Sequence, residues 1–133
     1  MNSHIHYDDS RLLFRALLAN GVFSSLSGLI MLLAAGPVAQ MIGIAEPAWL
    51  RGLGAVLLVF GGSLLLHVYR RKVRRVEAVA ISAMDLGWVI GSALLLLLVP
   101  ELFSATGVVA VLVVAAIVFA FFELQAYALW KAR

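Results

Sequence analysis

The chain has 133 residues, of which 64% are hydrophobic and only 13% are charged. A soluble protein carries roughly 25% charged residues, so this composition excludes a surface covered by water alone and requires extensive contact with lipid. The net charge of +3 comes from basic residues at the ends of apolar segments, where lipid headgroups, not nucleic acid, are the expected partner. The chain has no cysteine, which excludes disulfides, thiolate metal sites and thiol redox centres.

Four segments are long enough and apolar enough to cross a bilayer, which takes about 20 mostly apolar residues per helix. In chain order they cover residues 11–35, 48–69, 76–99 and 105–130. Hydrocarbon provides no partner for free backbone groups, so segments this apolar must be helical. The sequence therefore predicts an all-α integral membrane protein, a four-transmembrane-helix bundle that forms a single membrane domain over residues 1–133.

Helix-breaking and capping residues mark the ends of these segments. Gly36-Pro37 is expected to end the first segment, and Pro47 stands where a proline opens a helix, at the first position of the second. Ser104 or Thr106 can cap the fourth segment. The loop between the first two segments is mostly apolar, so we expect it to lie along the membrane interface or to fold back on the bundle.

The positions of Lys and Arg predict the orientation of the bundle. Nine of the ten lie at the start of the first segment, between the second and third, or after the fourth; only Arg51 lies on the opposite side. The positive-inside rule then places both termini in the cytoplasm, and we expect the inner membrane of a bacterium. The run RRKVRR between the second and third segments is expected to attract anionic lipid headgroups. Its headgroup-binding residues are Arg70, Arg71, Lys72, Arg74 and Arg75.

The histidines have less specific expectations. His4 and His6 are expected in a disordered N-terminal tail, and His67 at the membrane interface near the basic loop. No signal-peptide cleavage site follows the first apolar segment, so we expect that segment to be retained.

The first and third segments carry a faint internal repeat. The stretches NGVFSSLSGLIMLL (20–33) and DLGWVIGSALLLLL (85–98) both begin with an amide or acid. An aromatic residue follows three positions later, a serine seven positions later, and then a leucine-rich tail. Two repeated helical hairpins or a chance likeness of apolar sequences would both explain this pattern.

Asn20, Asp85 and Glu123 are predicted to lie at nearly one depth on three helices, about 12–15 Å from the cytoplasmic ends at 1.5 Å per residue. An ionised aspartate at mid-helix costs about 2.5–3.5 kcal/mol, so we expect these side chains to face one another inside the bundle. Asp85 would act there as a hydrogen-bond donor or proton acceptor, oriented by Asn20. The alternative is that the cluster only joins helices, with about 0.6 kcal/mol per hydrogen bond.

Helical periodicity places further residues near this cluster. Ser27 lies on the same face of its helix as Asn20. Trp88 follows Asp85, and Tyr127 follows Glu123, by about one helical turn. The candidate ligand-binding or proton-accepting residues are Asn20, Ser27, Asp85, Trp88, Glu123 and Tyr127.

Small residues indicate where helices can approach closely. Gly54 and Gly61 are one heptad apart in the second segment and are expected to let a neighbouring helix pack against it. Gly87 and Gly91 form a second small-residue pair, which could serve inside the bundle or at a contact between subunits.

Three functions fit this pattern. The leading hypothesis is a binding or accessory protein that holds a small amphipathic ligand, of the quinone or lipid type, in a polar pocket within the bundle. The alternatives are a proton-coupled small transporter that acts as an oligomer, and a structural partner subunit of a larger membrane complex. The sequence contains no Gly-rich phosphate loop, H-E-x-x-H or G-x-S-x-G motif, so it indicates no catalytic residue, metal site or cofactor and gives an enzyme little support.

Span count, length and Gly- and Leu-rich hairpins such as LRGLGAVLLVFGG (50–62) make the chain similar to small bacterial four-span inner-membrane proteins, and it resembles the DoxX-like proteins among them. Some members of that group are associated with quinone-linked oxidoreductase systems, so the resemblance implies a quinone-type ligand. Small multidrug transporters also have four spans, but they carry their membrane-embedded acid in the first. Here the first span carries Asn20, which weighs against that family.

Overall fold

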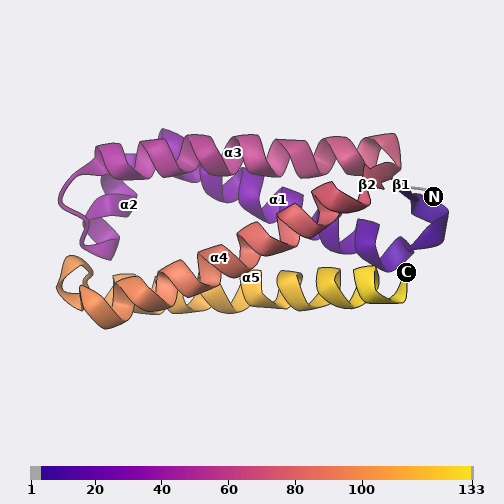
Figure 1. Cartoon of the computed structure of the whole chain (residues 1–133). Helices are drawn as coiled ribbons and strands as arrows, with labels where there is room; N and C mark the ends of the chain where they lie inside the picture. Colours follow the sequence, from indigo (N-terminus) through magenta and orange to yellow (C-terminus); the bar gives the residue numbers. More distant parts are fainter. Residues whose placement is uncertain (1–3, 133) are drawn as a thin grey trace.

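The computed structural model describes residues 4–132 and consists mainly of four long helices packed as a bundle (Figure 1). The helices are α1 (Arg11–Leu33), α3 (Pro47–Arg70), α4 (Arg75–Leu98) and α5 (Ala105–Lys131). Each is long and apolar enough to cross a membrane, and large hydrophobic side chains such as Leu33, Val59 and Leu97 are exposed on the outer surface. The predicted all-α bundle with four membrane spans is confirmed, and each helix end lies within two residues of its expected position.

The ends of α3 and α5 show why the helices begin where they do. Pro47 is the first residue of α3, and the carboxylate of Glu46 accepts a hydrogen bond from the backbone N–H of Ala48 at 3.3 Å. The hydroxyl of Ser104 accepts from the backbone N–H of Gly107 at 3.0 Å and so caps α5. Both side chains satisfy N–H groups that the first helical turn leaves without partners. The expected roles of Pro47 and Ser104 are confirmed.

Helices α1 and α3 pack closely because glycines face each other where they cross. A Cβ atom added to Gly54 would lie 2.7 Å from the carbonyl oxygen of Gly28, and one added to Gly61 would lie 2.8 Å from that of Gly21. Such distances are too short for any side chain, so the two backbones touch directly. The expected role of Gly54 and Gly61 in close helix packing is confirmed.

The other two long helices pack differently. Helix α5 contacts α4 and α1, whereas α3 and α5 lie along opposite edges of the bundle with α1 and α4 crossing between them (Figure 1). A methyl group added to Gly87 or Gly91 of α4 would meet no neighbouring atom of the described residues within 4 Å. Among the described residues, Gly87 and Gly91 therefore do not mark a close approach between helices.

The apolar loop after α1 folds back on the bundle. It forms a short helix, α2 (Ala35–Ile42), which packs against α3 and α5 and buries Ala35 and Ala39 beside Leu50. Gly36-Pro37 does not end the first span, because α1 already ends at Leu33 and Pro37 lies in the first turn of α2. A proline is tolerated there since the first helical N–H groups have no partner within the helix.

A two-stranded ribbon lies at the end of the bundle that carries most of the basic residues, which we call the basic end (Figure 1). Strand β1 (His4–His6) pairs antiparallel with β2 (Lys72–Arg74), and a short 3-10 helix, η1 (Tyr7–Asp9), leads from β1 toward α1. A second one, η2 (Pro100–Leu102), joins α4 to α5 at the far end. The expectation of a disordered tail at His4 and His6 is wrong, because Lys72-Val73-Arg74 offers a strand whose inward side chain is apolar.

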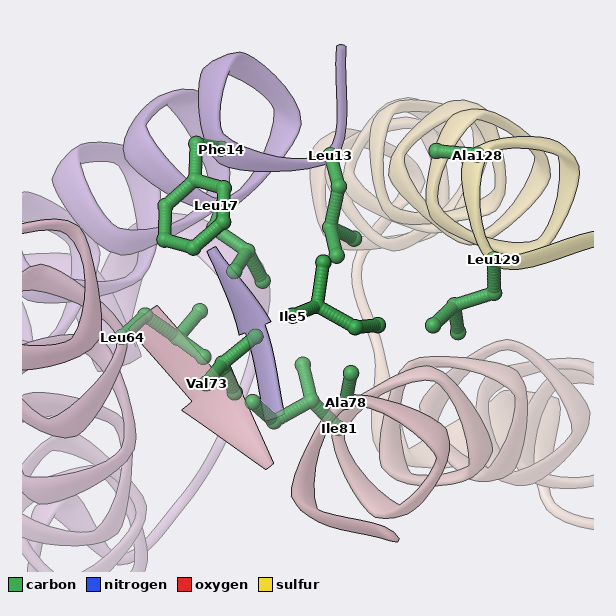
Figure 2. Packing of buried hydrophobic residues seen from close by; sticks show 10 residues of the cluster. All are labelled: Ile5, Leu13, Phe14, Leu17, Leu64, Val73, Ala78, Ile81, Ala128 and Leu129. Atoms are coloured by element: carbon green, nitrogen blue, oxygen red, sulfur yellow. The ribbon is translucent and has the colours of Figure 1, made fainter. Parts of the chain in front are cut away.

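The ribbon contributes its apolar side chains to the interior of the bundle. Ile5 is 4% exposed and its strand partner Val73 is 1% exposed, and Figure 2 shows both among side chains from the long helices. Together they form what we call the apolar layer, which consists of Ile5, Leu13, Phe14, Leu17, Leu64, Val73, Ala78, Ile81, Ala128 and Leu129. The layer separates the middle of the bundle from the aqueous phase at the basic end.

Candidate functional site

Asp85 is buried in the middle of the bundle and is held by two amide side chains. Only 3% of the residue is exposed. Its Oδ2 atom accepts a hydrogen bond from Nδ2 of Asn20 on α1 and another from Nε2 of Gln125 on α5, both at 2.8 Å. The predicted contact between Asp85 and Asn20 is confirmed, and the two residues that the sequence repeat aligns touch each other.

Further hydrogen bonds extend this contact into a network of three helices. Nδ2 of Asn20 also donates to Oε1 of Gln125 at 3.0 Å, and the hydroxyl of Ser24 donates to Oδ1 of Asn20 at 3.0 Å. Nε2 of Gln125 lies 3.4 Å from the hydroxyl oxygen of Ser82, which accepts from it. We call this set the polar cluster; its members are Asn20, Ser24, Ser82, Asp85 and Gln125, all buried.

Glu123 does not belong to the polar cluster. It is exposed on the outer face of α5, whereas Gln125 is 0% exposed and faces Asp85. Two residues turn a helix by about 200°, so the two side chains point to nearly opposite faces. The prediction that Glu123 faces Asp85 is wrong, and an amide replaces the second acid. Gln125 shares a face with Val118 and Leu129, which are also buried, but in a helix this apolar the sequence does not distinguish that face from the others.

The remaining candidate residues are not members of the polar cluster. Ser27 and Trp88 are half-buried, and Nε1 of Trp88 is buried without a hydrogen-bond partner among the described residues. Tyr127 is 50% exposed, with its ring beside that of Trp130 and 5.6 Å from Nζ of Lys131. Tyr127 therefore lies on the outer surface near the basic end, where aromatic residues contact lipid headgroups.

Asp85 has amides, and no cation, as its partners among the described side chains. Near the basic end, Nε2 of His67 lies 3.7 Å from Oε2 of Glu77. That pair places His67 near the basic end, at the position expected for an interfacial residue. No group of three His, Cys, Asp or Glu side chains in this part of the chain could hold a metal ion. At Asp85 the structure shows a buried carboxyl group that accepts hydrogen bonds from two neutral amides.

The polar cluster lies between the apolar layer and a cavity. On the basic side, Leu17 and Ile81 of the apolar layer precede Asn20 and Asp85 by about one helical turn. On the other side, a cavity of about 300 Å³ lies between α4 and α5. Its walls are formed by Val89, Ser92, Ala93, Leu96, Leu112, Ala115, Ala116 and Phe119.

The cavity and the polar cluster share one face of α4. Ser92 is one of the residues that line the cavity, and it follows Asp85 by seven residues, which is two helical turns. Leu112 and Phe119 are also exposed on the surface, so the cavity opens toward the surrounding lipid. Sequence reasoning missed this cavity, because opposed small side chains on two helices leave no distinct pattern in either segment.

The comparisons with known proteins identify no relative. No family model matches the chain, and no curated protein sequence or solved structure matches it either. The resemblance to DoxX-like proteins stays a prediction. The fold and the polar cluster define a small multi-pass integral membrane protein with a buried acidic residue.

Proposed function

We propose that this protein binds a small amphipathic molecule, of the quinone or lipid type, between α4 and α5. The observation that carries the proposal is an apolar cavity that lies on the same face of α4 as Asp85, with Ser92 of its wall two helical turns away from that residue. The apolar part of the ligand would enter the cavity from the bilayer, and its polar end would point toward Trp88 and Asp85. The setting we propose is a bacterial inner membrane with the basic end in the cytoplasm.

Polar contacts must provide most of the selectivity for such a ligand. Lipid tails are as apolar as the cavity wall, so moving an apolar chain from one to the other gains little free energy from the hydrophobic effect. The indole N–H of Trp88 is buried and has no partner within residues 4–132. Leaving a buried donor unpaired costs about 1–3 kcal/mol, which a ligand oxygen accepting from Trp88 would recover. Rotation of the Gln125 amide would make Asp85 available as a second polar partner.

Native mass spectrometry of the protein extracted in a mild detergent tests this proposal. We expect one bound small molecule of constant mass in the wild type and its loss in Asp85→Ala. Ala115→Phe fills the cavity without changing the polar cluster and should also lose the ligand. Val113→Phe is the matched control, because Val113 is exposed on α5 outside the cavity wall and should retain the ligand.

The outcomes separate the parts of the proposal. No bound molecule in a correctly folded wild type would contradict ligand binding altogether. Equal retention in Ala115→Phe and the wild type would place the ligand elsewhere in the bundle. Thermal unfolding of all four proteins shows whether a lost ligand reflects a lost fold.

The alternative we retain is a proton-coupled transporter that acts as an oligomer. It is favoured by the neutral partners of Asp85, since a carboxyl group held only by amides can take up and release a proton without breaking an ion pair. This alternative predicts a proton flux in liposomes that disappears in Asp85→Asn. A structural subunit of a larger complex would instead carry another polypeptide through purification from its native membrane.

A further inference from the structure

Helix α5 has an outer face that stays exposed in a single copy of the chain. The helix lies along one edge of the bundle and packs on α1, α2 and α4, with Val118 and Gln125 buried on its inner side (Figure 1). The residues two positions before and after each of these point about 200° away from them, toward the outside. All four are exposed. We call them the α5 outer face; its members are Ala116, Ala120, Glu123 and Tyr127.

The carboxyl group of this face lies at the depth of the hydrocarbon. Helix α5 has 27 residues, so at 1.5 Å per residue it is about 40 Å long and exceeds the hydrocarbon core of about 30 Å. Glu123 precedes Lys131 by eight residues, or about 12 Å. With the excess length shared between both ends of the helix, Glu123 lies about 7 Å inside the hydrocarbon.

Nothing in a single copy stabilises that carboxyl group. No hydrogen bond or ion pair within residues 4–132 involves the side chain of Glu123. Acidic side chains within membrane spans almost always face the interior of a bundle or a water-filled cavity, because lipid offers them no partner. The exposed position of Glu123 therefore indicates a protein contact that a single copy does not provide.

A hydrogen-bond donor lies one helical turn from Glu123 on the same face. The ring of Tyr127 lies beside Trp130 and Lys131, but no hydrogen bond within residues 4–132 involves its hydroxyl group. Helical side chains lean toward the N-terminal end of their helix, which brings this hydroxyl group toward the depth of Glu123. At 100° per residue, Glu123 and Tyr127 lie about 20° to either side of a line through Ala116.

A second copy of the chain offers each of these groups its counterpart. Two copies in one bilayer have the same orientation and the same depth. In a dimer with two-fold symmetry, a contact of residue i with residue j is repeated as a contact of j with i. The left side of one helix face then meets the right side of the other, so Glu123 of each copy faces Tyr127 of the other. The alanines of the α5 outer face are small enough to let the two helices approach closely.

We propose that two copies of the chain associate through the α5 outer face, with the hydroxyl group of Tyr127 in each copy donating a hydrogen bond to the carboxyl group of Glu123 in the other. The two carboxyl groups lie on opposite sides of the symmetry axis and do not face each other. The contact uses no member of the polar cluster and does not depend on the ligand proposed above. Ala116 also belongs to the cavity wall, so the contact lies beside the cavity.

Disulfide cross-linking of single-cysteine variants locates the contact, because the chain has no cysteine of its own. Ala120→Cys places a thiol in the α5 outer face, and Val59→Cys places one on the exposed side of α3. Each position lies eleven residues before the last residue of its helix, Lys131 or Arg70, so the two thiols have the same depth. We expect oxidation in liposomes to join copies of Ala120→Cys and to leave Val59→Cys as single chains.

Substitutions of the hydrogen-bonding pair test its role. Förster transfer between copies labelled at Ala132→Cys, over a range of protein-to-lipid ratios, gives the dissociation constant of the dimer. Tyr127→Phe removes the donor and should raise this constant about sevenfold, the factor for two membrane hydrogen bonds of average strength. Glu123→Gln keeps an acceptor and should leave it within about twofold. Tyr127→Phe added to Glu123→Leu should have no further effect, because the acceptor is already absent.

Three results would overturn the proposal. The first is equal cross-linking of Ala120→Cys and Val59→Cys, or none in either. The second is an unchanged dissociation constant in Tyr127→Phe. The third is an undiminished effect of Tyr127→Phe in the Glu123→Leu background. Circular dichroism identifies any variant that has lost its fold, and Ala116→Cys, one turn from Ala120, provides a second cross-linking position on the same face.

Discussion

At the scale of single residues, Gln125 is one of the two amides that hold Asp85 inside the bundle, and the one that the sequence did not predict. It donates to the carboxylate, accepts from Asn20 and lies within hydrogen-bond distance of Ser82. A buried carboxyl group needs such partners because the surrounding hydrocarbon provides none. The expected second acid at Glu123 would have added a like charge beside Asp85 and raised the cost of burial.

Gln125→Leu is therefore expected to destabilise the bundle. The substitution leaves Asp85 and Asn20 each without one hydrogen-bond partner, and an unsatisfied buried polar group costs about 1–3 kcal/mol. The free energy of unfolding in mixed micelles of detergent and denaturing surfactant measures the change. Glu123→Gln is the control two residues away, where an exposed site should change stability by less than about 0.5 kcal/mol. Equal stability of the two variants would mean that the polar cluster contributes nothing to the fold.

At the scale of helices, the crossing of α1 and α3 depends on the absence of side chains. Gly54→Val would place a methyl group against the backbone of Gly28, where a Cβ atom alone already comes within 2.7 Å of the carbonyl oxygen. We expect the helices to separate at a cost of at least about 1–3 kcal/mol. Gly62→Val, on the open side of the same helix, is the matched control because no atom of residues 4–132 lies within 4 Å of its Cβ position. The difference between the free energies of unfolding of the two variants measures this cost. If Gly54→Val is as stable as Gly62→Val, α1 and α3 can move apart without loss of stability.

The four long helices could be predicted from the sequence because lipid imposes a strong and simple constraint on them. Length, apolar composition and breakers such as Pro47 were enough to bound them. The contact of Asn20 with Asp85 followed from their similar depth and from the cost of exposing a carboxylate to lipid. Gln125 was missed because helices this apolar have almost no polar side to distinguish an inward from an outward residue. The ribbon was missed because strands of three residues have no periodicity to detect, and their pairing joins segments far apart in the chain.

At the scale of the whole molecule, orientation in the membrane is the first property to measure. The chain has no cysteine, so single cysteines can report sidedness without background. We expect Lys72→Cys to be protected from a membrane-impermeant maleimide in intact cells and to react in inverted vesicles. Glu46→Cys, at the other end of α3, should show the reverse pattern. Labelling of both positions from the same side would contradict a spanning α3, and a swapped pattern would reverse the proposed orientation.

The pairing of β1 with β2 also has a consequence for biosynthesis. His4 leaves the ribosome long before its partner Arg74, and in between the chain must insert both α1 and α3. Ile5 therefore remains outside the membrane, on the side where the chain is synthesised, until α1 and α3 have inserted. The ribbon forms only after that. An affinity tag fused ahead of His4 would lie next to β1 while it pairs with β2. A tag fused after Ala132 would not be part of the segment that pairs. Expression experiments on this protein should start from the second arrangement.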